Sequence, residues 1–218
     1  MLIGSLRGVE MDKPVERAPV AADTRRRLPP GERRRQIVDG AVAFFAEVGL
    51  DGNTRDLARR LGVTQSLIFR YFTTKDDLIE AVYEQVYLER LSPDWPDRLT
   101  DRAVPLRGRL LAFYTRYSAL IFQSEWMRIF MFSGLAGAAL NRRYLQQLSG
   151  MILKPLLGEI ADAAAPGREP TMEDLWNLHG GIVYIGIRQH IYGMPCPEDP
   201  SDAIERAIDR FLNDFGIA

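Results

Sequence analysis

The side chains best suited to bind a nucleic acid lie between Arg55 and Lys75. Gln65 carries a carboxamide that can pair with adenine through two hydrogen bonds in the major groove of B-DNA. Arg55 and Lys75 stand where helices are expected to begin, so their charges and the helix N-termini can both attract backbone phosphates. Tyr71 can either contact DNA or complete the packing of its own hairpin. These residue types predict a DNA-binding surface, because phosphate contacts position a protein on the duplex and base contacts read the sequence.

The charge of the sequence is unevenly distributed. Residues 25–75 include eleven basic and five acidic side chains, a net charge of +6, whereas residues 76–218 carry −6 and the whole chain −1. A compact basic part joined to an acidic remainder is typical of a nucleic-acid-binding module attached to a second domain, although accidental clustering of solvated charge gives the same pattern. Residues 25–27, all arginine, are expected to form a solvated tail, with an arm that enters the minor groove as the alternative.

The sequence indicates no other chemistry. A single cysteine, Cys196, excludes an internal disulfide and a cysteine-based metal cluster, and no base is evident beside it. The two histidines, His179 and His190, lack the spacing of a zinc-binding helix. No catalytic set, metal site or cofactor is therefore predicted. An all-α enzyme with a basic N-terminal region is the rival interpretation.

The composition also predicts a cytoplasmic protein. No uncharged apolar run reaches the roughly 18 residues that a membrane-spanning helix needs. The first residues are partly charged and lack a long apolar stretch, which is not the pattern of a secretory signal. Residues 1–30 lack apolar periodicity and contain four prolines, so a disordered leader is expected there, with either Met1 or Met11 as the natural start.

Three helices must position the polar side chains. Apolar residues spaced by three and four predict a first helix over residues 31–48. The second and third helices are expected over residues 54–61 and 65–71, with a tight turn at Gly62 and a capping hydroxyl at Thr64. Two short helices joined by a glycine-containing turn suit a helix-turn-helix, whose second helix enters the major groove.

One continuous part of the sequence resembles a known family. The matching stretches are Ala41–Phe45, Glu47–Leu50, Asp56–Ala58, Leu61–Thr64, Ile68–Phe72 and Lys75–Leu78. This pattern is similar to that of the TetR family of bacterial transcriptional regulators, and its most specific part is the Gly-Val-Thr…Tyr-Phe-x-x-Lys run. The resemblance implies an all-helical, homodimeric, ligand-responsive DNA-binding protein, usually a repressor.

The resemblance also implies which side chains contact DNA. At the matching positions they are Arg55, Thr64, Gln65, Ser66, Leu67, Phe69, Tyr71 and Lys75. Phe69 replaces the tyrosine usual in the family, which removes a hydroxyl that would bond a phosphate. Leu67 replaces a small or hydroxylated residue, which favours contact with a thymine methyl group. The segment 49–58 is also one residue shorter than is usual.

The rest of the chain predicts further helices and no strands, so the expected fold is all-α. Apolar stripes indicate helices over residues 106–121, 140–164, 172–192 and 201–215, with Pro155 as a kink in the second. The predicted organisation is a leader (1–30), a helix-turn-helix DNA-binding domain (31–78) and an effector-binding and dimerisation domain (79–218).

Aromatic side chains in the second domain suggest a small-molecule site. As a group they can wall an apolar cavity, although each alone is more typical of ordinary core. We expect an apolar or aromatic effector with one or two polar handles, bound by Phe113, Tyr117, Trp126, Arg128, Phe130, Trp176, His179 and Tyr184. A buried Arg128 would require an acidic partner or an anionic ligand. His179 alone is more typical of a hydrogen-bonded core histidine.

A homodimer is expected through the last two helices. Residues 175–191 are apolar on most faces and contain Gly180, Gly181 and Gly186, which suggests close contact with another helix. Residues 204–215 supply a second apolar face, and both helices with their copies would form a four-helix bundle. The alternative is a central helix buried within one chain.

These expectations combine into one functional prediction. A closed dimer reads a near-palindromic DNA operator, which doubles the length of sequence recognised. The sequence therefore predicts a repressor that binds such an operator and is released by a small effector. An activator and a ligand-independent DNA-binding protein of the same fold are the alternatives.

Overall fold

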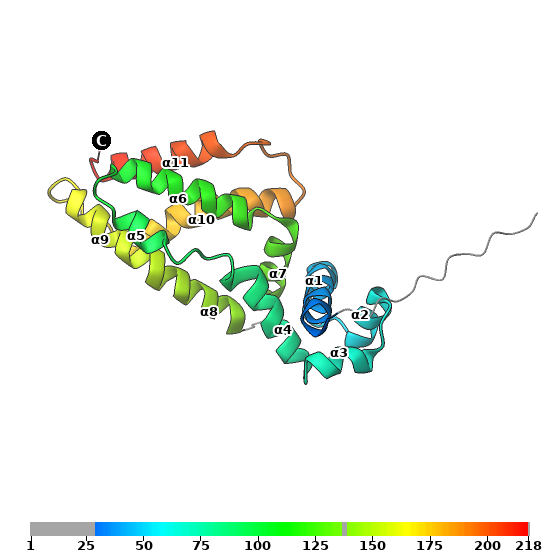
Figure 1. Ribbon diagram of the computed structural model, residues 1–218. Coiled ribbons are helices and arrows are strands. Elements are labelled where there is room, and N and C mark those ends of the chain that lie inside the picture. The colour runs from blue at the N-terminus through cyan, green and yellow to red at the C-terminus, as the bar shows by residue number, and fades with distance from the viewer. Residues whose placement is uncertain (1–28, 137–138, 218) are drawn as a thin grey trace, which may run out of the picture.

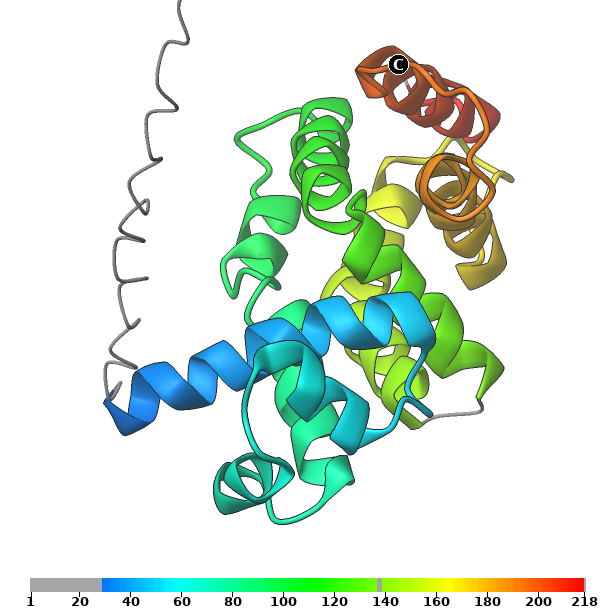
Figure 2. The same ribbon diagram turned by 90° about the vertical axis from the view of Figure 1, so that its right-hand side faces the viewer.

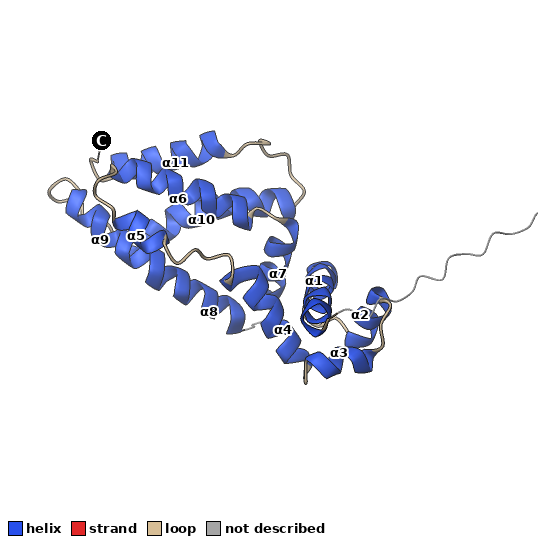
Figure 3. Ribbon diagram, viewed as in Figure 1, coloured by secondary structure: helices blue, strands red, loops and turns tan. Residues whose placement is uncertain are grey.

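The computed structural model describes residues 29–136 and 139–217, and all regular structure within these ranges is helical (Figures 1 and 3). The predicted all-α fold is confirmed. None of the described helices combines the length and the apolar character that crossing a bilayer requires.

The α-helices are α1 (Pro30–Val48), α2 (Thr54–Leu61), α3 (Gln65–Tyr71), α4 (Lys75–Tyr83), α5 (Trp95–Thr100), α6 (Leu106–Ile121), α7 (Ser124–Leu135), α8 (Ala139–Leu148), α9 (Lys154–Ala163), α10 (Met172–His190) and α11 (Ser201–Asp214). Two π-helical turns, at Glu84–Leu88 and Ser149–Leu153, continue α4 and join α8 to α9.

Local capping signals define the three N-terminal helices. α1 begins at Pro30, one residue inside the predicted leader, and residues 1–28 lie outside the described residues. The Asn53 side chain accepts a backbone N–H of the first turn of α2 (2.8 Å). Gly62 ends α2 with a φ of +64°, a left-handed conformation that glycine adopts without strain. The Thr64 hydroxyl then accepts a backbone N–H of α3 (3.2 Å). The predicted turn and cap are therefore confirmed.

α4 joins the helix-turn-helix to the rest of the protein. It begins with a capping box, in which Thr74 and Asp77 exchange side chain–backbone hydrogen bonds of 2.9 and 3.1 Å. The helix continues past position 78/79, the predicted domain boundary, and extends through the first π-helical turn. The two predicted domains are therefore connected by continuous helix.

Two features of the C-terminal part differ from the sequence prediction. α5 was not anticipated, and Pro96 lies in its first turn, where a missing N–H costs no intrahelical bond. The single helix predicted over residues 140–164 is instead α8, a π-helical turn and α9. Pro155 lies in the first turn of α9, directly after the irregular turn. A proline cannot donate to the preceding turn, which explains why the helical ladder is irregular there.

The helices after α4 form one body, and the helix-turn-helix projects from one side of it (Figures 1 and 2). α10 and α11 pack together and against α6, whereas α8 and α9 lie along the opposite edge. α1 packs against α4 and α7, so buried apolar side chains of both parts form one continuous cluster. A displacement within the helical body can therefore reach the helix-turn-helix through α7 as well as through α4.

Candidate nucleic-acid interface and effector region

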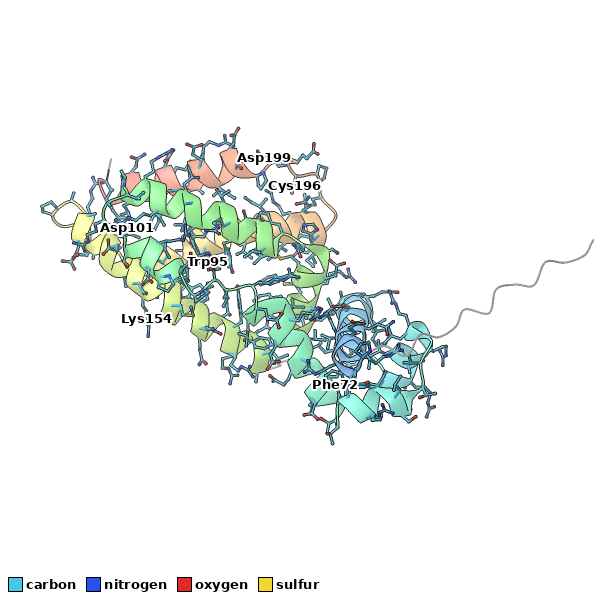
Figure 4. The ribbon with its side chains drawn as sticks, viewed as in Figure 1. Phe72, Trp95, Asp101, Lys154, Cys196 and Asp199 are labelled. Atoms are coloured by element: carbon cyan, nitrogen blue, oxygen red, sulfur yellow. The ribbon has the colours of Figure 1, made fainter. Side chains whose placement is uncertain are left out.

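α3 has one apolar face toward the protein and one polar face toward solvent. Ile68 and Phe72 are buried, and Figure 4 shows Phe72 where α3 meets α4. On the opposite face Ser66, Phe69 and Arg70 are exposed, and Phe69 exposes 40% of its surface. A helix held by its inner face and exposing an aromatic ring, a hydroxyl and a guanidinium can dock into a groove of DNA.

All eight predicted DNA contacts lie on α2, on α3 with its capping Thr64, or at the first residue of α4, at the end of the molecule remote from α11 (Figure 1). Four side chains are exposed: Arg55, Thr64, Ser66 and Phe69. The other four are half-buried: Gln65, Leu67, Tyr71 and Lys75. Arg70 was not among the predicted contacts. Arg70 lies four residues after Ser66, so the two side chains share one face of the helix. This spacing could have identified Arg70 as a residue of the exposed face from the sequence.

Gln65 makes a contact that its sequence position did not reveal. Its side-chain Nε2 donates a hydrogen bond of 2.9 Å to the Thr54 hydroxyl, which is buried at the start of α2. This bond links the two helices of the helix-turn-helix and uses one of the two N–H hydrogens of the Gln65 amide, so the second N–H and the amide oxygen are left for pairing with adenine. Base reading by Gln65 remains a prediction, and this internal bond leaves the groups for it available.

Lys75 begins α4, as predicted, but the helix N-terminus is already occupied. The Asp77 carboxylate accepts the Thr74 backbone N–H, and the Thr74 hydroxyl accepts the Asp77 N–H. Two of the N–H groups that a phosphate would use are thus bonded within the protein, and a carboxylate stands beside them. The ammonium group of Lys75, rather than the helix N-terminus, is the group expected to meet a phosphate.

Six of the predicted effector-binding residues belong to one aromatic cluster in the helical body: Phe113, Tyr117, Trp126, Phe130, Trp176 and His179. The Trp126 and Phe130 rings are stacked with centroids 5.0 Å apart, and the Phe113 and Tyr117 rings are stacked at 5.4 Å. The Tyr117 hydroxyl is 2.8 Å from the Tyr144 hydroxyl and 3.5 Å from Nε2 of His179. The structure therefore brings together residues from α6, α7, α8 and α10, as a site between these helices requires.

The centre of this cluster is nearly filled. The cavity between Tyr87, Tyr117, Trp126 and Tyr144 measures only about 10 Å³, which is about the space of one water molecule. Larger spaces lie at its margins, about 220 Å³ beside Phe113 and about 610 Å³ beside Trp176. An effector would therefore bind at a margin or displace central rings.

His179 is buried within this cluster and exposes 5% of its surface. Burial lowers the pKa of its imidazole to about 4, because the charged form is poorly solvated there. The ring is therefore neutral at neutral pH. It can offer a hydrogen bond to a ligand but no positive charge.

The structure does not bring Tyr184 and Arg128 to the cluster. Tyr184 is 49% exposed on the outer face of α10, where its ring lies beside the Arg188 guanidinium. Arg128 reaches in the opposite direction, and its guanidinium donates hydrogen bonds to the carbonyls of Ala46 and Glu47 in the last turn of α1. These carbonyls form the negative end of the helix, which provides the compensation that a partly buried arginine needs. Neither the acidic partner nor the anionic ligand expected for a buried Arg128 is required.

Arg128→Met is expected to loosen the contact between α7 and α1. The variant keeps the apolar stem but leaves two carbonyls of α1 without their donors, which should cost about 1–3 kcal/mol. Hydrogen exchange of the amides in residues 45–50 should accelerate, while exchange in α10 stays unchanged. Arg142→Met, on the exposed surface of α8, is the matched control. Equal exchange in both variants would show that Arg128 does not hold α1.

α10 and α11 leave an uncovered surface in the single chain. Gly180 and Gly181 are exposed, and a Cβ at either position would meet no heavy atom within 4 Å. Gly181 lines a groove of about 390 Å³ between the two helices, together with Leu178, Ala207 and Phe211. Gly186 is different, because its missing side chain leaves room for Met127 and Phe122 of the same chain. Only two of the three glycines are therefore available to a partner subunit.

Comparison with known proteins gives a family match in the helix-turn-helix. Residues 37–82 match the family model described as bacterial regulatory proteins, tetR family. The HTH-type transcriptional repressor Rv3405c of Mycobacterium tuberculosis is 36% identical over 97 residues, which are 42% of this chain and 52% of that protein. The chain thus spans about half the length of these mycobacterial relatives.

Longer matches extend into the helical body. The HTH-type transcriptional regulator BetI of Burkholderia lata is 30% identical over 163 residues, which cover 69% of this chain and 82% of that protein. A TetR-like transcriptional regulator from Rhodococcus sp. RHA1 has the same fold, with a TM-score of 0.66 at 17% identity, over 86% of this chain and 99% of that one. Because similarity to a regulator of this kind covers most of its length, the chain belongs to the TetR family of bacterial regulatory proteins.

Proposed function

We propose that this protein is a homodimeric transcriptional repressor that binds a near-palindromic DNA operator and is released by a small molecule. The observation that carries the proposal is the exposed face of α3, with Ser66, Phe69 and Arg70 outward and Ile68 inward. That face belongs to the segment matched by the family model, and the mycobacterial relative is named a repressor. A protein that acts on bacterial DNA works in the cytoplasm.

The proposed division of labour follows the predicted domains. Residues 31–78 bind DNA, and residues 79–218 bind the effector and dimerise. In the dimer the two copies of α3 would lie about 34–36 Å apart, one turn of B-DNA. An effector that prefers a different angle of α4 would change this separation and shift the population away from the DNA-binding state.

One observation favours a second candidate function. The central aromatic cluster encloses only about 10 Å³, so a ligand-independent DNA-binding protein of the same fold needs no rearrangement of the core. Selection of bound sequences from random DNA tests the part that both candidates share. A near-palindromic consensus supports either candidate, and small molecules that release the selected DNA then distinguish them. Enrichment of no sequence would contradict both.

Gln65 and Lys75 are expected to act differently on the selected operator. Gln65→Ala should relax the preference at one base position by about 1–3 kcal/mol. Lys75→Ala should weaken all sequences by a similar factor and reduce the salt dependence of binding, because it removes a phosphate contact. Competition binding at several salt concentrations measures both effects.

Thr54→Val is the control for the internal bond of Gln65. It removes the hydroxyl that Gln65 contacts at 2.9 Å but leaves the amide free for a base. If Thr54→Val relaxes the same base position as Gln65→Ala, the bond orients α3 and Gln65 does not read the base. If both Gln65→Ala and Lys75→Ala merely weaken all sequences equally, base reading by Gln65 is wrong.

A further inference from the structure

Arg34 stands on the inner face of α1 although its side chain is charged. It precedes the buried Ile37 and Val38 by three and four residues, so the three side chains share one face of the helix. Apolar residues normally occupy such a face. The Arg34 guanidinium lies over the Phe72 ring, with its central carbon 5.0 Å from the ring centroid. The fold therefore directs this cation to the junction of α3 and α4, where Figure 4 shows Phe72.

Contact with an aromatic ring holds the Arg34 guanidinium but leaves its N–H groups available. These donors lie in the plane of the guanidinium, so stacking on a ring face uses none of them. Arg34 is exposed, and within residues 29–136 and 139–217 no carboxylate forms an ion pair with it. The guanidinium is therefore placed by the fold and can donate hydrogen bonds to an anion.

Two further cations lie within three residues of Phe72. The exposed Arg70 guanidinium lies over the Tyr71 ring, 5.8 Å from its centroid, and Lys75 begins α4. Among the described residues neither Arg70 nor Lys75 forms an ion pair, whereas both arginines in the last turn of α2 are paired with carboxylates. Basic side chains of α1, α3 and α4 are thus gathered at one corner of the molecule.

This corner fits a DNA duplex better than a small free anion. Asp76 and Asp77 lie in the first turn of α4, and Asp77 is engaged in the capping box. These carboxylates repel a free anion that approaches the corner. A duplex docked on α3 instead carries a row of phosphates whose positions are set by that helix. The α3–α4 junction is one end of α3, and the DNA backbone passes the ends of a helix that lies in the major groove.

We propose that Arg34 binds a backbone phosphate of the DNA on which α3 docks, next to the phosphate that Lys75 meets. A guanidinium pairs with a phosphate through parallel hydrogen bonds, and prior placement over Phe72 reduces the entropy lost on binding. The contact carries no base information, but it adds α1 to the DNA-binding surface, which the sequence limits to α2, α3 and the start of α4. The inference rests on the proposed function and names a further residue of the same surface.

The salt dependence of binding to a random-sequence DNA duplex tests the contact without any operator. Each phosphate that a protein neutralises adds about 0.9 to the slope of log affinity against log salt concentration. Arg34→Met keeps a flexible stem over Phe72 but removes the charge. The slope should therefore decrease by about 0.9 for each bound subunit, and the affinity at about 0.1 M salt should fall about eightfold for each. Base preferences on selected sequences should stay unchanged, because no base contact is lost.

Three control variants separate this contact from general effects of charge and folding. Arg116→Met, on the exposed surface of α6 in the helical body, removes the same charge and should leave the slope unchanged. Arg35→Met removes the next charge, which is exposed about 100° farther around α1, and should change the slope less than Arg34→Met does. Arg34→Lys keeps a positive charge and should retain most of the slope. Circular dichroism of each variant verifies that the helices remain.

Three results would overturn the proposal. They are an unchanged slope in Arg34→Met, an equal decrease in Arg35→Met or Arg116→Met, and the same decrease in Arg34→Lys despite its charge. Each of these results leaves DNA binding by α3 intact and does not contradict the proposed function. A wild-type protein that binds no duplex at any salt concentration would instead contradict the proposed function, and this proposal with it.

Discussion

Gly181→Leu is expected to convert the proposed dimer largely into monomers at micromolar concentration while each chain still folds. A Cβ at Gly181 meets no heavy atom of its own chain within 4 Å, so a larger side chain fits the single subunit. In a bundle of α10 and α11 with their copies, the same side chain would stand between two closely packed helices. Overpacking of this kind costs about 1–3 kcal/mol, and the symmetric dimer carries the change twice.

The experiment compares two positions on one helix. Analytical ultracentrifugation should show a lower dimer fraction for Gly181→Leu, circular dichroism should show unchanged helical content, and operator binding should weaken. Gly186→Leu is the contrasting variant, because a Cβ there would lie 2.5 Å from the Met127 methyl group and 2.6 Å from the Phe122 ring. It should lower the thermal stability of the chain itself. A Gly181→Leu protein that stays dimeric and binds the operator normally would place the interface elsewhere.

The second large expected effect is a loss of stability on acidification that depends on His179. The folded protein holds the pKa of this imidazole at about 4, against 6.5 for the free side chain. Between pH 6.5 and about 4, His179 is therefore protonated in the unfolded chain but stays neutral in the folded chain. The free energy of unfolding should fall as the pH decreases from about 6.5 to about 4, by about 3 kcal/mol in total from this group. Above pH 6.5 this group should have no effect.

Urea unfolding across this pH range measures the effect, and His179→Phe isolates it. The variant keeps an aromatic ring of similar size but has no proton to gain, so its stability should be nearly constant between pH 6.5 and 4.5. The Glu159 carboxylate provides an internal contrast. The neighbouring Arg102 and Arg109 hold its pKa below the usual 4.5, so its contribution is lost only in more acidic solution. Identical pH profiles for both proteins would mean that His179 is accessible to protons in the folded state.

The parts of the fold that follow from local signals could be predicted from the sequence. The turn at Gly62, the cap at Thr64 and the capping box at residues 74–77 depend on side chains within a few residues of the backbone groups they serve. α5 could not be predicted in this way. From the sequence, Pro93 and Pro96 are equally expected to interrupt a helix. Pro96 is compatible with α5 only because it lies in the first turn of that helix.

The sequence was enough to predict which helices and exposed residues form the candidate site. It was not enough to predict the hydrogen bonds between residues far apart in the sequence. The exposure of Ser66 and Phe69 follows from the helical period once Ile68 is recognised as the anchor. The Arg128 contact does not, because its acceptors are backbone carbonyls 81 and 82 residues away and no side-chain type marks them. For the same reason the sequence indicated an aromatic cluster but not that its centre is filled.

The π-helical turn after α4 determines how this protein should be compared with its relatives. A turn of this kind contains an additional residue, and each residue rotates a helix by about 100°. Tyr87 lies in this turn, with its ring centroid 5.1 Å from that of Trp126 and 5.3 Å from that of Tyr144. A relative that lacks the additional residue would keep a continuous helix but present a different side chain to these rings. Loss or gain of one residue within positions 84–88 would therefore change which side chain packs against Trp126 and Tyr144. Evolution can alter this part of the core in that way without substituting any core residue.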